Sequence, residues 1–150
     1  MDNLSISAVS ADDTDAVVQL LTAQLLEHEI VTAEEALRGV VRTVLSDERH
    51  GFMLLAHAHG CAVGVAYAAA HLSAEHGGVV GWLEELYVAP EYRGRSVGSA
   101  LLADVLARAE RLRWRGIELE VVGGHERAAA LYVRHGFIAA PRSRYTRVFP

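Results

Sequence analysis

The sequence predicts an α/β domain whose mixed sheet has six to seven strands, flanked by about four helices. Segments of alternating apolar residues and segments of helical spacing follow one another in the order β-α-α-β-β-β-α-β-α-β-β. No internal repeat, low-complexity segment or linker interrupts that order. A chain of 150 residues with 51% hydrophobic content is long enough for one domain with its own core. We therefore expect residues 1–150 to form a single domain.

The first three elements are a strand and two helices. Residues 4–9 alternate apolar and polar side chains, which is typical of a strand. Asp12 or Asp13 can cap a first helix. Thr32 and Glu35 have the spacing of a capping box, which predicts the start of a second helix.

Three strands are predicted next. Residues 51–60 and 61–72 form two apolar runs that meet at a turn near Gly60. Residues 79–88 form another run, which Pro90 ends. Together these segments predict the middle of the sheet.

The last part of the chain alternates between the two kinds of element. A broad apolar face beginning at Val97 predicts a long helix, and residues 116–122 predict a strand. Residues 125–136 predict a helix ended by Gly136. Two final strands are expected at residues 137–141 and 143–149.

Composition excludes several kinds of chemistry. All 14 basic residues are Arg, so a Walker A phosphate loop and a lysine Schiff base are both excluded. The only cysteine, Cys61, cannot form an internal disulfide. No secretory signal and no apolar run of transmembrane length are evident, so we expect a cytoplasmic protein with no membrane partner.

Charge is divided unevenly along the chain. Residues 1–92 carry 14 acidic and 3 basic residues, whereas residues 93–150 carry 5 acidic and 11 basic residues. This division suggests one face for a cationic ligand and another for an anionic ligand, or merely solvated surface charge. The net charge of −5 argues against nucleic acid as a partner.

The stretch YRGRSVGSALL, residues 92–102, has the features of an anion site. A glycine-containing turn leads directly into a helix, whose first N–H groups are unsatisfied and carry partial positive charge. The turn combines charged donors, small residues and hydroxyl donors: Arg93, Arg95, Gly94, Gly98, Ser96 and Ser99. A pyrophosphate fits such a turn, while a structural turn with solvated arginines is the alternative. The spacing of a Rossmann dinucleotide loop is missing, which argues against NAD.

Three segments resemble the GNAT superfamily of N-acetyltransferases. RGRSVG, residues 93–98, is similar to the family's acetyl-CoA loop, Arg/Gln-x-x-Gly-x-Gly/Ala, with Ser96 in place of the first motif glycine. The preceding LYVAPEYRG looks like the family's strand and loop. HERAAALYVRHGF resembles the later Asn-x-x-Ala-x-x-x-Tyr segment, with His125 in the Asn position. The resemblance covers about residues 80–140.

The resemblance implies acetyl-CoA as co-substrate and a binding site for each of its parts. Backbone groups at the end of the strand before the loop would contact the pantetheine arm, and these are Leu86, Tyr87 and Val88. Backbone amides of the loop would hold the pyrophosphate, beside the Arg93 side chain: Gly94, Arg95, Ser96, Val97, Gly98 and Ser99. His125, at a predicted helix start, would also touch the coenzyme.

Direct acetyl transfer needs a base, an oxyanion donor and an acid. Glu84 occupies the position at which diamine-acetylating relatives place a water-binding glutamate, so the resemblance implies a general base or water holder there, with a mere edge-of-sheet charge as the alternative for both Glu84 and Glu85. Glu85 would contact the substrate ammonium or lie at the surface, since successive residues of a strand face opposite sides. The resemblance implies Tyr132 as the acid for the leaving thiolate, with core packing as the alternative, and the N–H of Val88 as the oxyanion donor.

The function expected is acetyl transfer to a primary amine of a small cationic molecule. The weaker resemblance to diamine acetyltransferases and the acidic first part of the chain favour it. A protein N-acetyltransferase and a non-catalytic acyl-CoA-binding module on the same fold remain alternatives. His57 and His59 share a strand face but have no evident third ligand, so no metal is expected. A homodimer is compatible with the apolar final strands.

Overall fold

The computed structural model describes residues 3–150. These divide into two compact units, the first ending at Glu120 and the second running from Val121 to Pro150. The first unit contains a sheet with helices on both faces. The second contains one helix and an irregular tail.

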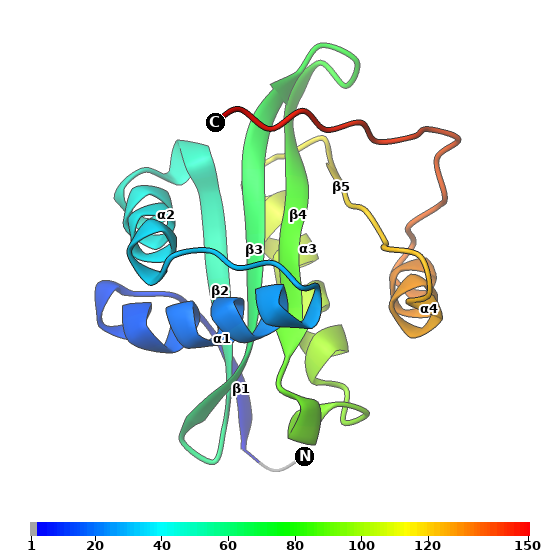
Figure 1. Cartoon of the computed structure of the whole chain (residues 1–150). Helices are drawn as coiled ribbons and strands as arrows, with labels where there is room; N and C mark the ends of the chain where they lie inside the picture. The colour runs from blue at the N-terminus through cyan, green and yellow to red at the C-terminus, as the bar shows by residue number, and fades with distance from the viewer. Residues whose placement is uncertain (1–2) are drawn as a thin grey trace. The chain divides into compact units, whose positions relative to one another are not determined.

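The sheet of the first unit follows the order of the chain, β1 to β5 (Figure 1). Its strands are β1 (Leu4–Ala8), β2 (Gly51–Ala58), β3 (Cys61–Ser73), β4 (Gly78–Val88) and β5 (Gly116–Glu118). The first four are antiparallel neighbours, and β5 pairs in parallel with β4. The predicted α/β class with a mixed sheet is confirmed, although the described residues form five strands rather than six or seven.

Helices cover both faces of this sheet. On one face lie α1 (Thr14–Glu27) and α2 (Glu34–Ser46), and on the other lies α3 (Val97–Arg111) (Figure 1). Val17, Val41 and Leu55 belong to the core under α1 and α2 and are fully buried. On the α3 face, a Cβ on Gly64 of β3 would lie 3.0 Å from Leu101 Cδ1, so glycine permits the close approach of helix and strand.

The first helix starts where predicted, with Asp13 at the N-cap of α1, although the Asp13 side chain does not cap that helix; the start of the second helix differs from the prediction. The capping box lies earlier, where the Ser10 N–H and hydroxyl both donate to Asp13 Oδ2, at 2.8 and 3.0 Å. The predicted box of Thr32 and Glu35 is wrong, because Ala33 occupies the N-cap of α2. The Glu35 carboxylate instead accepts a hydrogen bond from Arg42 at 3.1 Å.

The second unit contains α4 (Glu126–Arg134), close to the predicted helix. The strands predicted at residues 137–141 and 143–149 are wrong, because this part of the described chain is irregular, and β5 ends at Glu118 rather than at residue 122. Alternating apolar residues define the faces of a strand but do not supply the neighbouring edge to which its backbone must bind. Tyr145 and Val148 are 92% and 83% exposed, so the alternation buries no apolar face.

Among residues 3–150, no helix combines the length and the apolar character that crossing a bilayer requires.

Candidate active site

The end of β4 has one paired edge and one open edge. On one side, β3 pairs with β4 along its whole length, from Gly78 to Val88. On the other side, the described part of β5 pairs only with residues 80–82. Along residues 83–88, the edge of β4 that faces away from β3 therefore presents backbone groups that no described strand uses.

The direction of those backbone groups follows from one hydrogen bond. The N–H of Ala89 donates to the carbonyl of Val63 on β3 at 2.8 Å. Because alternate residues of an antiparallel strand turn their N–H and C=O groups to opposite edges, Val88 and Leu86 direct theirs to the open edge. The backbone of Tyr87 is directed toward β3 instead. This alternation favours the predicted arm contacts of Leu86 and Val88 and does not favour a backbone contact of Tyr87.

A β-bulge brings the two glutamates of β4 to one place. Tyr67 of β3 pairs with Glu85, and the next residue, Ala68, pairs with Leu83. Glu84 is therefore an extra residue without a cross-strand partner in this register. The strict alternation that would send the two carboxylates to opposite faces does not hold here.

Glu84 and Glu85 have different environments. The Glu84 residue is exposed, and Glu85 is partly buried. Burial, and next the negative charge of Glu84, raises the pKa of Glu85 to about 7. Burial likewise raises the pKa of Tyr67, with a smaller contribution from the charge of Glu84. The three groups therefore form an interacting set in which one carboxyl can exchange protons near neutral pH.

Tyr67 also lines a hollow of about 410 Å³ beneath α2. The other lining residues are mostly small or aliphatic: Ala36, Gly39, Val40, Thr43, Val44 and His50. Nothing in the sequence pattern singled out Tyr67. Its signal is its position opposite Glu85, which becomes visible only once β3 and β4 are paired.

The loop after β4 turns sharply into α3. Gly94 and Ser96 both have left-handed backbone conformations, with φ of +73° and +63°. Ser96 is the N-cap of α3, and its carbonyl accepts the N–H of Ala100 at 3.0 Å. Because a left-handed φ suits glycine best, this geometry gives a backbone reason for the glycine usual at the Ser96 position in the family that the sequence resembles.

The N–H groups of the first turn of α3 have no acceptor within the helix, as at any helix start. Gly98 and Ser99 lie in that turn and are partly exposed, whereas Val97 is buried in the core. The predicted pyrophosphate residues are thus consecutive around one helix start.

The two arginines of the loop have different surroundings. Arg93 Nη2 lies 2.6 Å from Glu27 Oε1 at the end of α1, and Arg93 Nε donates to the carbonyl of Val88 at 2.8 Å. Arg95 lies over the ring of Tyr92, 5.8 Å from its centroid. Within residues 3–150, no carboxylate forms an ion pair with Arg95.

The second unit contains the other two predicted site residues. His125 is the exposed N-cap of α4. Tyr132 lies in the last turns of that helix and is partly buried, with its ring 5.7 Å from that of Phe137 in an edge-on contact. This contact accounts for part of the ring's packing and does not by itself assign a role to the hydroxyl.

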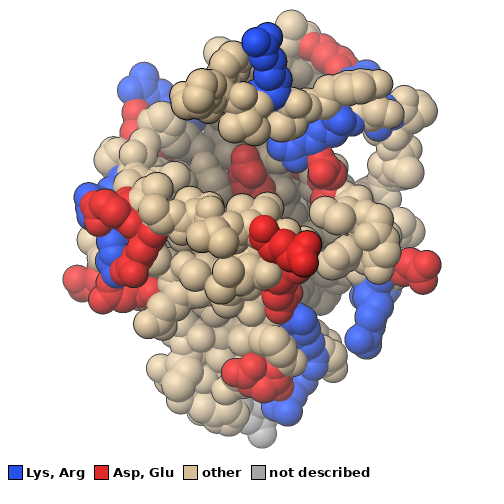
Figure 2. Space-filling model, in the orientation of Figure 1, with Lys and Arg blue, Asp and Glu red and all other residues tan. Residues whose placement is uncertain are grey.

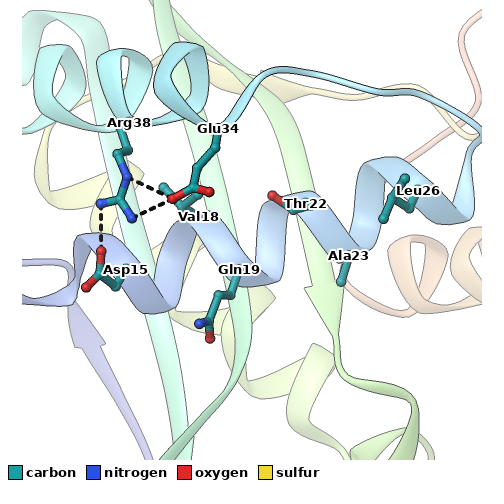
Figure 3. A pocket seen from close by; sticks show the side chains of 8 residues that line it. All are labelled: Asp15, Val18, Gln19, Thr22, Ala23, Leu26, Glu34 and Arg38. Carbon is teal, nitrogen blue, oxygen red and sulfur yellow. Dashed lines mark hydrogen bonds and ion pairs between the residues drawn. The ribbon is translucent and has the colours of Figure 1, made fainter.

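A groove of about 510 Å³ lies between α1 and α2, apart from the sites predicted from the sequence (Figure 3). At one end, Arg38 bridges the two helices, with Nη1 2.6 Å from Asp15 Oδ1 and Nη2 2.8 Å from Glu34 Oε1. Red and blue side chains alternate over these helices on the left of Figure 2. The acidic groups that line the groove, Asp15 and Glu34, are therefore already paired with Arg38. The (i, i+4) spacing of Glu34 and Arg38 was the signal available in the sequence.

No group of three or more His, Cys, Asp or Glu side chains that could hold a metal ion occurs in the described part of the chain.

The mixed sheet with helices on both faces and the turn leading into α3 make the first unit an α/β domain. The sequence profile of the acetyltransferase (GNAT) family matches residues 15–137. The chain therefore belongs to the acetyltransferase (GNAT) family, and the family and enzyme class predicted from the sequence are confirmed.

Solved structures with the same fold include acetyltransferases from bacteria. An aminoglycoside N-acetyltransferase in complex with CoA is 20% identical, with a TM-score of 0.82, over 97% of this chain and 95% of that one. A predicted acetyltransferase with acetyl-CoA from Clostridium acetobutylicum is 15% identical, with a TM-score of 0.81, over 96% of each chain. A ribosomal-protein-alanine N-acetyltransferase from Brucella melitensis biovar Abortus 2308 is 22% identical, with a TM-score of 0.79, over 98% of this chain and 99% of that one. A comparison with curated proteins gives no match.

Proposed function

We propose that the protein transfers the acetyl group of acetyl-CoA to a primary amine of a small cationic molecule. One observation carries the proposal: the open end of β4 lies within four residues of the paired glutamates of the bulge and directly before the loop into α3. Backbone donors for a thioester arm, carboxylates for an ammonium and a helix start for phosphate are thus consecutive. The relatives solved with CoA and acetyl-CoA support the choice of co-substrate.

The loop would bind the phosphates, and the strand would orient the thioester. Amides of residues 94–99 would donate to the pyrophosphate, with Arg95 adding charge. Leu86 would hydrogen-bond the pantetheine arm at the open edge, where the Val88 carbonyl already accepts a hydrogen bond from Arg93. Acetyl-CoA supplies an acetyl thioester whose carbonyl carbon is attacked by nitrogen.

The carboxylate pair would make the amine nucleophilic. An alkylammonium has a pKa near ~10.4 and must lose a proton before it can attack. Glu84 would accept that proton directly or through a water molecule, while the partly buried Glu85 would hold the ammonium beside Tyr67. The raised pKa of Glu85 suits proton exchange near neutral pH, so the pair would act as one unit.

Two further groups would complete the reaction. The N–H of Val88 would donate to the carbonyl oxygen as negative charge develops on it. As the carbon–sulfur bond breaks, the hydroxyl of Tyr132 would give a proton to the thiolate. His125 would add a coenzyme contact from the start of α4. We also propose that both units belong to one functional domain, because the family match runs through the boundary between them.

A kinetic panel tests this proposal. Release of free thiol from acetyl-CoA is measured with diamines, monoamines, amino acids and an N-terminal alanine peptide at equal concentration. We expect the highest kcat/KM for small amines with a second positive charge, and we expect added salt to raise their KM. A preference for the peptide would favour a protein acetyltransferase. Coenzyme binding without thiol release from any amine would favour a binding module.

A further inference from the structure

Arg93 makes three contacts that all lie within the first unit. Its Nη2 pairs with Glu27 at 2.6 Å, its Nε donates to the carbonyl of Val88 at 2.8 Å, and its Cζ lies 5.4 Å from the centroid of the Tyr87 ring. One guanidinium therefore joins the end of α1, the end of β4 and the loop before α3.

The hydrogen bond from Arg93 to the Val88 carbonyl holds the second polar group of one peptide in place. The peptide between Val88 and Ala89 donates its N–H to Val63 on β3 and accepts Arg93 Nε on its carbonyl. Both polar groups of that peptide are used on opposite sides. The backbone of Val88, whose own N–H is directed to the open edge, is thereby held from both sides.

The same contacts limit what Arg93 can offer to a phosphate. Its Nε and Nη2 are already used by Val88 and Glu27, and a charge-assisted pair at 2.6 Å must break before that part of the guanidinium turns away. Arg95, two residues later, is exposed and forms no ion pair within residues 3–150. Of the two arginines, Arg95 is the better candidate for the phosphates.

We propose that Arg93 is a positioning residue that ties the end of β4 to the end of α1 and so orients the backbone of Val88 toward the thioester. The role rests on the proposed acetyl transfer and departs from the phosphate contact that the sequence motif implies. Glu27 orients the guanidinium, and Arg93 orients the strand end. Both residues act through Val88 rather than on the substrate.

Two thioester donors separate positioning from phosphate binding. We compare acetyl-CoA with S-acetyl-N-acetylcysteamine, a thioester that has no phosphate. Arg93→Gln is expected to lower kcat/KM by a similar factor with both donors, of about 10-fold to 10²-fold. Arg95→Gln is the comparator, and it is expected to raise the calorimetric Kd for acetyl-CoA. A loss in Arg93→Gln that appears only with acetyl-CoA would overturn the proposal.

Glu27 gives the second arm of the experiment. Glu27→Gln is expected to act in the same direction as Arg93→Gln, and the double variant is expected to be no worse than Arg93→Gln alone, since both remove one tie. Glu29→Gln is the matched control, because Glu29 is an exposed carboxylate two residues further along. Unchanged kinetics in Glu27→Gln, or independent effects in the double variant, would overturn the tie.

A readout without turnover keeps this inference separate from the proposed function. Amide hydrogen exchange, followed by NMR, is expected to quicken at Ala89 in Glu27→Gln and Arg93→Gln but not in Glu29→Gln. If Arg93→Gln does not fold, Arg93→Lys is used, because an ammonium cannot reproduce the two-sided contact of the guanidinium. Absence of turnover in the wild type would refute the acetyl transfer, whereas unchanged exchange at Ala89 would refute the tie.

Discussion

Glu84 and Glu85 are adjacent in the chain, yet only Glu85 is partly buried. The bulge opposite Tyr67 removes the alternation that would otherwise separate them. Their charges interact, because Glu84 contributes to the raised pKa of Glu85. The proposed roles of Glu84 as proton acceptor and of Glu85 as ammonium partner can therefore be tested separately only if the interaction between the two carboxyl groups is measured as well.

Glu84→Gln keeps the size of the side chain but cannot accept a proton. We expect kcat/KM at pH 7 to fall by about 10²-fold and to recover partly at high pH, where more of the amine is free. Because the charge of Glu84 helps to raise the pKa of Glu85, the acidic limb of the profile should also move to lower pH. The measurement is a pH profile of kcat/KM with Glu48→Gln, an exposed carboxylate in another part of the chain, as control. Parallel profiles of equal magnitude would remove Glu84 from the mechanism.

Glu85→Gln tests the raised pKa through stability. The folded state holds the Glu85 proton with a pKa of about 7, against an ordinary value of 4.5. The stability that this proton contributes is present below pH 4.5 and is lost as the pH rises through 7. Relative to wild type, the variant should gain about 1–2 kcal/mol in free energy of unfolding between pH 4.5 and pH 8, after discounting for partial solvent screening. Urea unfolding at the two pH values measures this, and an equal difference at both would contradict the shift.

Tyr132→Phe removes a hydroxyl and keeps the ring contact with Phe137. If the hydroxyl gives its proton to the leaving thiolate, kcat should fall by about 10-fold to 10³-fold. The free energy of unfolding should change by no more than about 1 kcal/mol, because the packing remains. Single-turnover rates, with unfolding curves alongside, provide the test. Equal rates in both forms would assign Tyr132 to packing alone.

At the scale of elements, the turn and the start of α3 are specified by local chemistry. Left-handed φ values at Gly94 and Ser96 produce the turn, and an apolar face on α3 follows at once. The sequence predicted this pair of elements because turn residues and helical spacing are both local signals. The capping box at Thr32 was predicted incorrectly because the competing partner of Glu35, Arg42, lies a further two turns along the helix.

Gly98→Asp tests the use of this helix start for phosphate. A carboxylate in the first turn favours the helix itself, by about 0.3–1 kcal/mol, so the protein should remain folded. The same charge should repel a pyrophosphate and weaken the calorimetric Kd for acetyl-CoA by about 10-fold or more. Gly98→Asn has the same shape without the charge and separates bulk from repulsion. Unchanged affinity in a folded Gly98→Asp would show that the phosphates bind elsewhere.

The sheet shows where prediction from the sequence stops. The strands β1 to β4 were predicted because β1 alternates apolar and polar residues and the other three are apolar runs bounded by turns, and β2 buries nearly all of its residues. Strand pairing depends on distant segments, so the bulge at Glu84 and the irregular tail after α4 were not predictable from local patterns. The open edge of β4, which the proposed site depends on, is likewise a property of the paired sheet and not of any one segment.

At the scale of the whole molecule, the distribution of charge can be read from the sequence, but the partners of the charged groups cannot. The acidic first part and the basic last part are evident from the chain alone. Ion pairs then consume some of that charge within α1 and α2, where Arg38 joins Asp15 and Glu34. Partners of this kind become known only from the fold, so the proposed preference for a cationic amine rests on the carboxylates at the bulge rather than on net charge.

The transfer of a labelled acetyl group tests the central proposal most directly. The protein is given acetyl-CoA that carries isotope in its acetyl group, together with the amine that releases thiol fastest, and both products are quantified. We expect one labelled amide for each free thiol, and we expect amide formation to be greatly slowed in Glu84→Gln. Thiol without labelled amide would mean hydrolysis, and neither product with intact coenzyme binding would mean a binding module. Either result would contradict acetyl transfer to an amine.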